Sequence, residues 1–109
     1  MRIERELMRG AGPVAVLRLL SEGEKYGYEL VKMLERKSDG VLAMGQSTLY
    51  PLLYNLQAKG LITSRIETGE SRPRKYYRLT EKGKRHLERE TQQWQALSVA
   101  MGKLGIPGA

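Results

Sequence analysis

The hydrophobic residues of this chain change their spacing at Gly60, and that change limits the folds open to the chain. Before Gly60, leucines recur at i, i+3, i+4 and i+7, the spacing of one face of an α-helix. These leucines are Leu49, Leu52, Leu53 and Leu56. After Gly60, residues 62–67 alternate in polarity with the period of a half-buried strand. The pattern therefore predicts a helix that leads directly into a small sheet.

The helix that carries these leucines is predicted over residues 46–59, with Gly45 as its N-cap and Gly60 as its C-terminal stop. Pro51 lies near the first turn, where the loss of one backbone hydrogen bond is tolerated. The face opposite the leucines carries small or aromatic uncharged side chains, namely Ser47, Pro51, Tyr54 and Ala58, flanked by Tyr50 and Asn55. A solvated helix face is ordinarily rich in charged residues. This face is therefore suited to close approach to another surface.

Two further helices are expected before it. The first covers residues 14–20 with Pro13 in its first turn, because Pro13 and the glycines of residues 10–12 disfavour helix farther upstream. The second covers residues 26–37, where apolar residues fall at amphipathic spacing and basic residues occupy the last turn. Residues 38–40 end it.

A hairpin is expected after the third helix. Strand 62–67 is followed by residues 68–74, which have the composition of a turn, and by a returning strand over residues 75–79. Tyr76 and Tyr77 alternate, so we expect one in the core and the other exposed. Three helices followed by a two-stranded hairpin with a basic tip predict a mainly α fold with a small β-hairpin, in the order of a winged helix-turn-helix.

The last helix begins after Thr80 as N-cap, with Glu81 in its first turn. Its residues at heptad a and d spacing are Gly83, Leu87, Glu90, Trp94, Leu97, Met101 and Leu104. So narrow a seam favours pairing with a partner chain, and the alternative is that it packs back on its own domain. We therefore expect a winged-helix domain over residues 1–79 and a dimerisation helix with a short tail over residues 80–109.

Composition excludes several classes of function. A chain of 109 residues with 40% hydrophobic and 28% charged residues has the size of one folded domain. It has no cysteine and a single histidine, His86, which excludes disulfides, thiol catalysis and multi-histidine metal sites. Without a Gly-rich phosphate motif or clustered carboxylates, we expect no enzyme, cofactor or metal. The lack of a long apolar run or a signal-peptide pattern predicts a cytoplasmic protein with no membrane role.

The distribution of charge is more informative than its total. The formal net charge is +7, and residues 59–89 alone carry ten basic and four acidic side chains, a net +6. A cluster of this kind is the footprint expected of a phosphate-binding element. The alternative is a basic face that only keeps the protein soluble.

Five segments resemble, in order and in spacing, the PadR family of bacterial transcriptional regulators. They are residues 16–20 (VLRLL), 26–30 (YGYEL), 47–54 (STLYPLLY), 59–62 (KGLI) and 74–83 (RKYYRLTEKG). The resemblance covers residues 10–97, and the single long last helix is similar to the shorter subgroup of the family. It implies a homodimeric winged helix, usually a repressor, whose last helix crosses its symmetry mate and which in some members responds to small aromatic compounds. Residues 10–13 depart from the family pattern and are expected to shorten the first helix.

Double-stranded DNA is the expected partner. We expect the third helix to enter the major groove, with the hairpin as a wing on the neighbouring backbone or minor groove. The expected contacts are Gln46, Ser47, Thr48, Tyr50 and Tyr54 of the helix, Lys59 at its end, and Arg72, Arg74 and Lys75 of the wing. Tyr50 and Tyr54 have the alternative of packing in the core, and Tyr26 and Tyr28 are expected to pack. Lys82, Lys84 and Arg85 are expected mainly to solvate the last helix.

The seam of the last helix defines the expected homodimer, through Leu87, Trp94, Leu97, Met101 and Leu104. On a two-fold axis two copies of Trp94 can sandwich a planar aromatic ligand. The alternative is that Trp94 only packs in the interface. A competing function of the whole domain is a winged helix that binds RNA or another protein.

Overall fold

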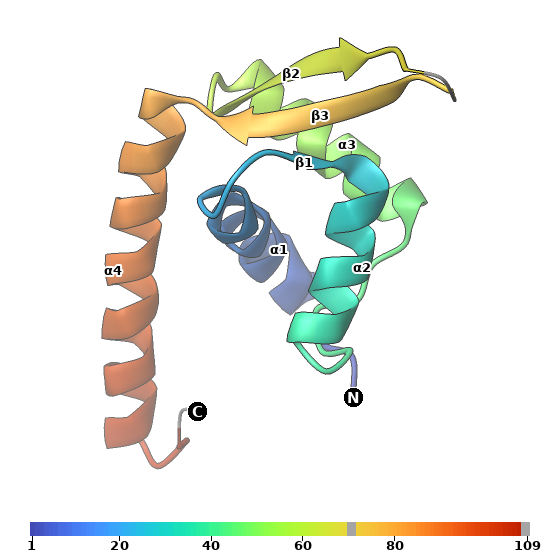
Figure 1. The fold of residues 1–109 in the computed structure, drawn as a ribbon. Helices are drawn as coiled ribbons and strands as arrows, with labels where there is room; N and C mark the ends of the chain where they lie inside the picture. The colour runs from blue at the N-terminus through green and yellow to red at the C-terminus, as the bar shows by residue number, and fades with distance from the viewer. Residues whose placement is uncertain (70–71, 108–109) are drawn as a thin grey trace.

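The structure describes residues 1–69 and 72–107, and in this computed structural model they form four α-helices and one three-stranded antiparallel sheet (Figure 1). The elements are α1 (Arg5–Leu20), β1 (Lys25–Tyr26), α2 (Gly27–Lys37), α3 (Gln46–Ala58), β2 (Ile62–Glu67), β3 (Arg74–Leu79) and α4 (Glu81–Lys103). No helix of the described part of the chain combines the length and the apolar character needed to cross a membrane.

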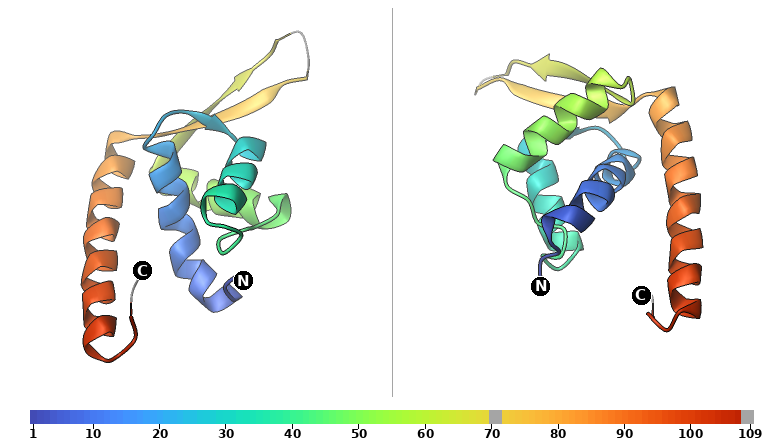
Figure 2. Two further views of the ribbon diagram at one scale, coloured as in Figure 1. Left: turned by 60° about the horizontal axis from the view of Figure 1, so that its bottom comes forward. Right: turned by 180° about the vertical axis from the view of Figure 1, so that it is seen from behind.

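The sheet lies across one end of the group formed by α1, α2 and α3, and α4 descends from the end of β3 beside α1 (Figures 1 and 2). The strand order is β1-β3-β2. The apolar core lies between the helices and the sheet and reaches the first part of α4. Its fully buried side chains are Val16, Leu17, Leu30, Leu49, Leu53 and Ile62.

Helix α3 has the start and the end that the sequence predicts. Gly45 is its N-cap, and Gly60 has a φ of 77°, a left-handed conformation that glycine adopts without steric cost. Three of the four predicted leucines, at positions 49, 53 and 56, are buried. Leu52 is half-buried, because it faces α1 at the edge of the core.

Helix α1 extends well upstream of Pro13, into the segment where the sequence disfavours helix. It begins at Arg5 and runs through both glycines and Pro13 to Leu20. Packing explains the extension, since a Cβ at Gly12 would come within 3.2 Å of the Leu52 side chain and 3.4 Å of Met44. Gly12 thus lets α1 approach α3 closely, and this burial outweighs the low helix propensity of the segment.

The sheet contains one strand more than the predicted hairpin. β1 pairs with β3 so that Tyr26 lies opposite Tyr76, while β2 pairs along the other edge of β3. β1 has only two residues, too few to show a readable alternation in the sequence. Tyr77 is the buried member of the tyrosine pair, as the alternation predicts, but Tyr76 is half-buried and not exposed, because it packs against Tyr26 and Arg65. Residues 70 and 71 of the predicted turn lie outside the described residues.

Helix α4 divides into a packed and an exposed part. Its N-cap is Thr80, whose hydroxyl oxygen accepts a hydrogen bond of 3.0 Å from the Gly83 amide. Gly83 and Leu87 are buried in the core of their own chain, whereas residues 91–103 are all exposed. Leu104 lies just past the helix as its C-cap. The first turns of the predicted seam therefore pack on the chain's own domain, and only the part from Trp94 onward remains open to a partner.

Gly83 is the tightest point of this junction. A Cβ there would overlap the carbonyl oxygen of Leu61 and approach the Leu79 side chain to 3.2 Å. We expect Gly83→Ala to lower the free energy of unfolding by about 2–3 kcal/mol, because the backbone of residue 61 has to move. Urea unfolding followed by circular dichroism measures the change.

Gly10→Ala is the matched control, since Gly10 lies inside α1 and a Cβ there meets nothing within 4 Å. It should raise the free energy of unfolding by about 0.5–1 kcal/mol through helix propensity. A Gly83→Ala variant as stable as the wild type would show that α4 does not dock as described.

Candidate nucleic-acid interface

The uncharged face of α3 points to solvent. Every residue predicted for this face is exposed, and Gln46, Ser47 and Thr48 are exposed at the N-terminus of the helix. No side chain caps this end, so the first backbone N–H groups of α3 stay available to an external acceptor. Such an end also carries the positive pole of the helix dipole and suits a phosphate.

The two tyrosines of α3 differ in their surroundings. Tyr54 is 75% exposed and projects freely, whereas Tyr50 is 40% exposed and its ring lies over Gly27 at the start of α2. A Cβ at Gly27 would come within 2.6 Å of the Tyr50 ring. Tyr50 therefore packs against α2 with part of its ring at the surface. This position combines features of its two predicted roles, packing in the core and contact with DNA. Burial, and then the nearby Tyr50, raise the pKa of Tyr77 beneath it.

The hairpin of β2 and β3 projects beyond the helices and carries the predicted basic contacts (Figure 2). Arg72, Arg74 and Lys75 are exposed. The Arg74 guanidinium lies 4.7 Å from the centre of the Tyr26 ring, and the Lys75 ammonium lies 5.7 Å from that of Tyr77. Stacking on aromatic rings holds the two cations near fixed positions while leaving their N–H groups available.

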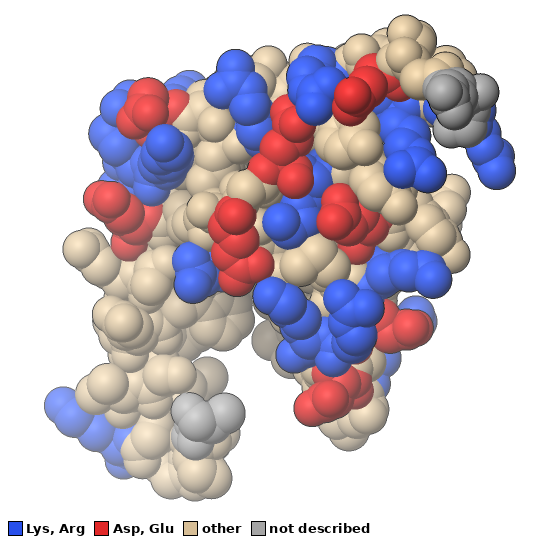
Figure 3. All heavy atoms as spheres, viewed as in Figure 1, with Lys and Arg blue, Asp and Glu red and all other residues tan. Residues whose placement is uncertain are grey.

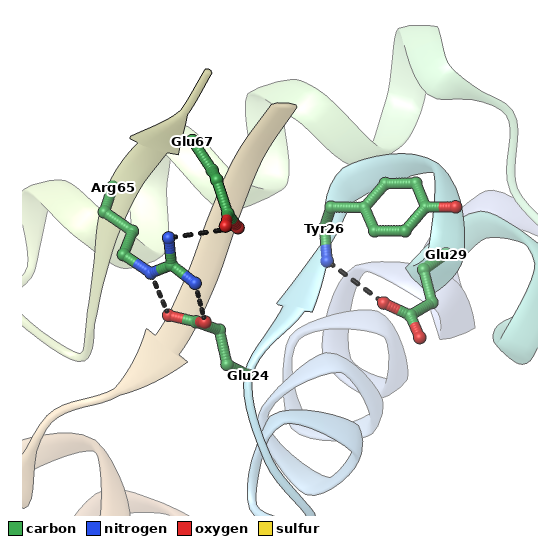
Figure 4. A network of polar contacts seen from close by, with 5 residues as sticks. All are labelled: Glu24, Tyr26, Glu29, Arg65 and Glu67. Atoms are coloured by element: carbon green, nitrogen blue, oxygen red, sulfur yellow. Dashed lines mark hydrogen bonds and ion pairs between the residues drawn. The ribbon is translucent and has the colours of Figure 1, made fainter. Parts of the chain in front are cut away.

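Arg65 stands apart from the other basic residues of the hairpin. Its guanidinium donates to both carboxylate oxygens of Glu24, at 3.0 and 2.6 Å, and to Glu67 at 3.3 Å (Figure 4). The hydrogen bonds from Arg65 lower the pKa of Glu24, so that carboxyl is ionised at neutral pH. The positive charge of Arg65 is thus compensated within the protein, although the sequence counts it in the basic segment.

Basic and acidic groups alternate on the face that carries the sheet. Figure 3 shows Lys and Arg side chains along the sheet and at the start of α4, with acidic side chains between them. Beyond its first turns, α4 shows few charges in this view. His86 and Glu90 lie 3.6 Å apart on α4, and no group of three possible metal-ligating side chains occurs within residues 1–69 and 72–107.

The fold also brings three arginines of the N-terminal segment beside the predicted contact Lys59, and the sequence did not predict these arginines as part of the interface. A groove of about 650 Å³ lies between the start of α1 and α3. Its cationic lining residues are Arg2, Arg5, Arg9 and Lys59. The first 58 residues carry a net charge of only +1, so segment charge did not indicate this cluster. The extension of α1 back to Arg5 places these arginines beside α3.

Tyr28 and Lys32 of α2 form a second missed pair. Tyr28 is 45% exposed, and the Lys32 ammonium lies 5.2 Å from the centre of its ring. Their i, i+4 spacing puts an aromatic ring and a cation on one helix face, a signal readable from the sequence. The sequence predicts that Tyr28 packs, but almost half of its surface is exposed, and its ring lies beside the Lys32 ammonium.

Three helices with a β-hairpin beside the third, exposed one define a winged helix-turn-helix protein. Comparison with known sequences identifies its family. The sequence model of the transcriptional regulator PadR-like family matches residues 16–89. The chain belongs to this family, which confirms the predictions of a transcriptional regulator and of a protein that is not an enzyme.

Individual relatives agree with this assignment. The chain is 35% identical over 92 residues to the transcriptional regulator YqjI of Escherichia coli, covering 84% of this chain and 43% of that protein. A PadR family regulator from Eggerthella lenta is 42% identical with a TM-score of 0.81, over 91% of this chain and 85% of that one. Bacillus subtilis PadR in complex with operator DNA is 32% identical with a TM-score of 0.66, over 72% of this chain and 45% of that one.

Proposed function

We propose that the protein is a homodimeric repressor that binds an inverted-repeat operator through α3 and the wing of β2 and β3. The observation that carries the proposal is the pairing of an exposed, uncharged face of α3 with cations on the adjacent wing. The relation to Bacillus subtilis PadR, whose structure is with operator DNA, supports DNA as the partner. Winged helices also bind RNA or proteins, so structured RNA is the competing partner in a binding test.

Helix α3 would read the major groove. Small side chains at Ser47 and Ala58 let the backbone approach the bases closely, and the 75% exposed ring of Tyr54 offers an apolar face to a thymine methyl group. The free N–H groups at the start of the helix would hold a backbone phosphate. With no Arg or Lys on this face, specificity would depend on few base contacts and on the shape of the DNA.

The wing would supply most of the affinity. Arg72, Arg74 and Lys75 are exposed cations near its outer end, and Lys59 ends the reading helix. Their main role would be to neutralise phosphates, which releases counterions and makes binding depend on salt.

The exposed part of α4 favours a dimer. Trp94, Leu97, Met101 and Leu104 are between 38% and 78% exposed in the single chain, along one side of the helix. The radius of gyration is 14.9 Å, above the roughly 13 Å of a compact chain of this length. A row of exposed apolar side chains of this kind marks a surface that a second molecule covers. A second copy of α4 supplies that surface and would set two α3 helices about one turn of DNA apart.

We expect the logarithm of DNA affinity to fall with the logarithm of salt concentration at a slope of roughly −5 to −7, for six to eight neutralised phosphates. Replacing Arg72 and Arg74 with Ala should make the slope less steep by roughly two to four, because each dimer loses four cations. Fluorescence anisotropy with a labelled duplex over a salt series measures the slope.

The control for this experiment replaces Arg36 and Lys103 with Ala, two exposed cations in the last turns of α2 and α4. The ends of these two helices lie away from the wing (Figure 1). This variant loses the same charge and should keep the wild-type slope. If the wing variant has the same salt slope as the wild type, the phosphate contacts lie outside the wing. Tighter binding to structured RNA than to duplex DNA would contradict the proposal.

The dimer has its own test. Leu97→Glu combined with Met101→Glu should convert the dimer to a monomer that keeps its fold, because charges buried in an apolar seam are poorly solvated. Val99→Glu is the matched control, since Val99 is 60% exposed on the same helix but lies off the seam. Sedimentation velocity distinguishes the two species, and an unchanged mass for the double variant would refute the α4 interface.

The seam also provides the proposed ligand site. Trp94 is the only tryptophan of the chain and is 39% exposed, so two copies across a two-fold axis would leave accessible indole faces. We expect planar aromatic compounds to quench its fluorescence and to weaken DNA binding, because they would insert between the indoles. Titration of a panel of such compounds, with a non-planar analogue as control, measures the effect. No quenching across the panel would leave Trp94 with a packing role.

A further inference from the structure

The outer half of the wing has no core beneath it. Along β2 the side chains pass from buried at Ile62 to exposed at Arg65, Ile66 and Glu67. On β3, Arg74 and Lys75 are likewise exposed, while Tyr77 and Leu79 are buried. Hydrophobic burial therefore fixes the inner end of the hairpin only, and something else has to fix the direction of its outer part.

One face of the sheet carries the contacts that can do this. Tyr26, Tyr76 and Arg65 lie directly opposite one another across β1, β3 and β2. The two tyrosine rings meet edge to face at 5.6 Å between centres, and the Arg65 guanidinium lies 4.8 Å from the Tyr76 ring. Glu24, just before β1, closes the row by accepting two of the three hydrogen bonds that Arg65 donates (Figure 4).

The far end of this row is anchored in the helical domain. Tyr26 is the N-cap of α2, and its backbone N–H donates to the Glu29 carboxylate at 3.2 Å (Figure 4). Glu24 and Tyr26 therefore move with α2, whereas Arg65 moves with the wing. The Glu24–Arg65 pair is bidentate and joins positions 41 residues apart, so it ties the wing to the body of the domain.

We propose that Arg65 is a positioning residue, and that its clamp on Glu24 sets the direction in which the wing presents Arg72 and Arg74 to DNA. The proposal rests on the DNA-binding function proposed above. It assigns opposite roles to two arginines of the hairpin. Arg74 stacks on Tyr26 and donates no hydrogen bond to a side chain within residues 1–69 and 72–107, whereas Arg65 donates its N–H groups to Glu24 and Glu67.

Charge and geometry predict opposite changes in DNA affinity for the Glu24→Gln variant. The substitution removes a negative charge near the wing and releases Arg65, so simple electrostatics predicts tighter DNA binding. Loss of the clamp predicts weaker binding to a specific site, because the wing has to be ordered at the cost of conformational entropy. The sign of the effect therefore separates the two explanations.

The experiment uses the full chain with two labelled duplexes, one selected by the wild-type protein from a random pool and one unrelated duplex of equal length. We expect Glu24→Gln to weaken binding to the selected duplex by about threefold to tenfold, with an unchanged salt slope and no loss on the unrelated duplex. Arg65→Lys should behave alike, because Lys keeps the charge and cannot form the bidentate pair. Thermal unfolding of each variant checks that the fold is intact.

Glu22→Gln is the matched control. Glu22 lies two residues from Glu24, is exposed, and pairs with Lys37 at 3.2 Å without contact to the wing. It makes the same change of charge and should leave the selected duplex bound as tightly as before, or slightly more tightly. Equal or tighter binding by Glu24→Gln would overturn the clamp, as would a less steep salt slope for Arg65→Lys.

Amide hydrogen exchange in the free protein tests the clamp without DNA. Glu24→Gln should speed exchange in the outer parts of β2 and β3, and Glu22→Gln should not. Unchanged exchange in Glu24→Gln would overturn the proposal. A wild-type protein that selects no duplex would instead refute the DNA-binding function, while the exchange result still decides whether Arg65 holds the wing.

Discussion

Burial of the leucines of α3 determines what the rest of the molecule can present. Leu49, Leu53 and Leu56 are at most 4% exposed and pack against α1, α2 and the sheet. Burying three leucine side chains contributes about 5–9 kcal/mol, which is comparable to the whole net stability of a small domain. The helix can therefore lie in only one rotation about its axis, and that rotation turns Ser47, Tyr54 and Ala58 outward. The exposed face is set by the core beneath it.

The sequence predicted those parts of the fold that depend on contacts between near neighbours. The boundaries of α3 and the Thr80 cap of α4 follow from residues within a few positions of one another. The extension of α1 depends instead on the fit of Gly12 against Leu52, forty positions along the chain. β1 depends likewise on pairing with Tyr76 and Tyr77. No local pattern encodes such contacts, and helix propensity at Gly10, Gly12 and Pro13 pointed the other way.

The same limit applies to the charges of the candidate interface, because the pairing of a charged side chain depends on contacts between distant residues. The sequence located the basic segment but could not tell a cation that stays open from one that is already paired. Arg65 and Arg74 look equivalent in a charge count, yet the fold gives Arg65 two carboxylates and Arg74 an aromatic ring. Conversely, Arg5 and Arg9 lie in a segment of almost balanced charge, and the fold brings them to a groove beside α3. Spatial pairing, and not segment composition, decides which charges remain available.

The junction between β3 and α4 links the proposed dimer interface to α3, the proposed DNA-reading helix. Thr80 donates its hydroxyl to the Gly60 carbonyl at 2.7 Å and its backbone N–H to that of Leu61 at 3.1 Å. It thereby fastens the start of α4 to the chain that follows α3. Gly83 then packs directly on Leu61, with no room for a side chain. Because Thr80 and Gly83 hold the start of α4 against the end of α3, a change in the angle between two α4 helices in a dimer would change the distance between the two α3 helices. A ligand held at Trp94 would therefore act on DNA binding through half-site spacing, with no need to reach α3 itself.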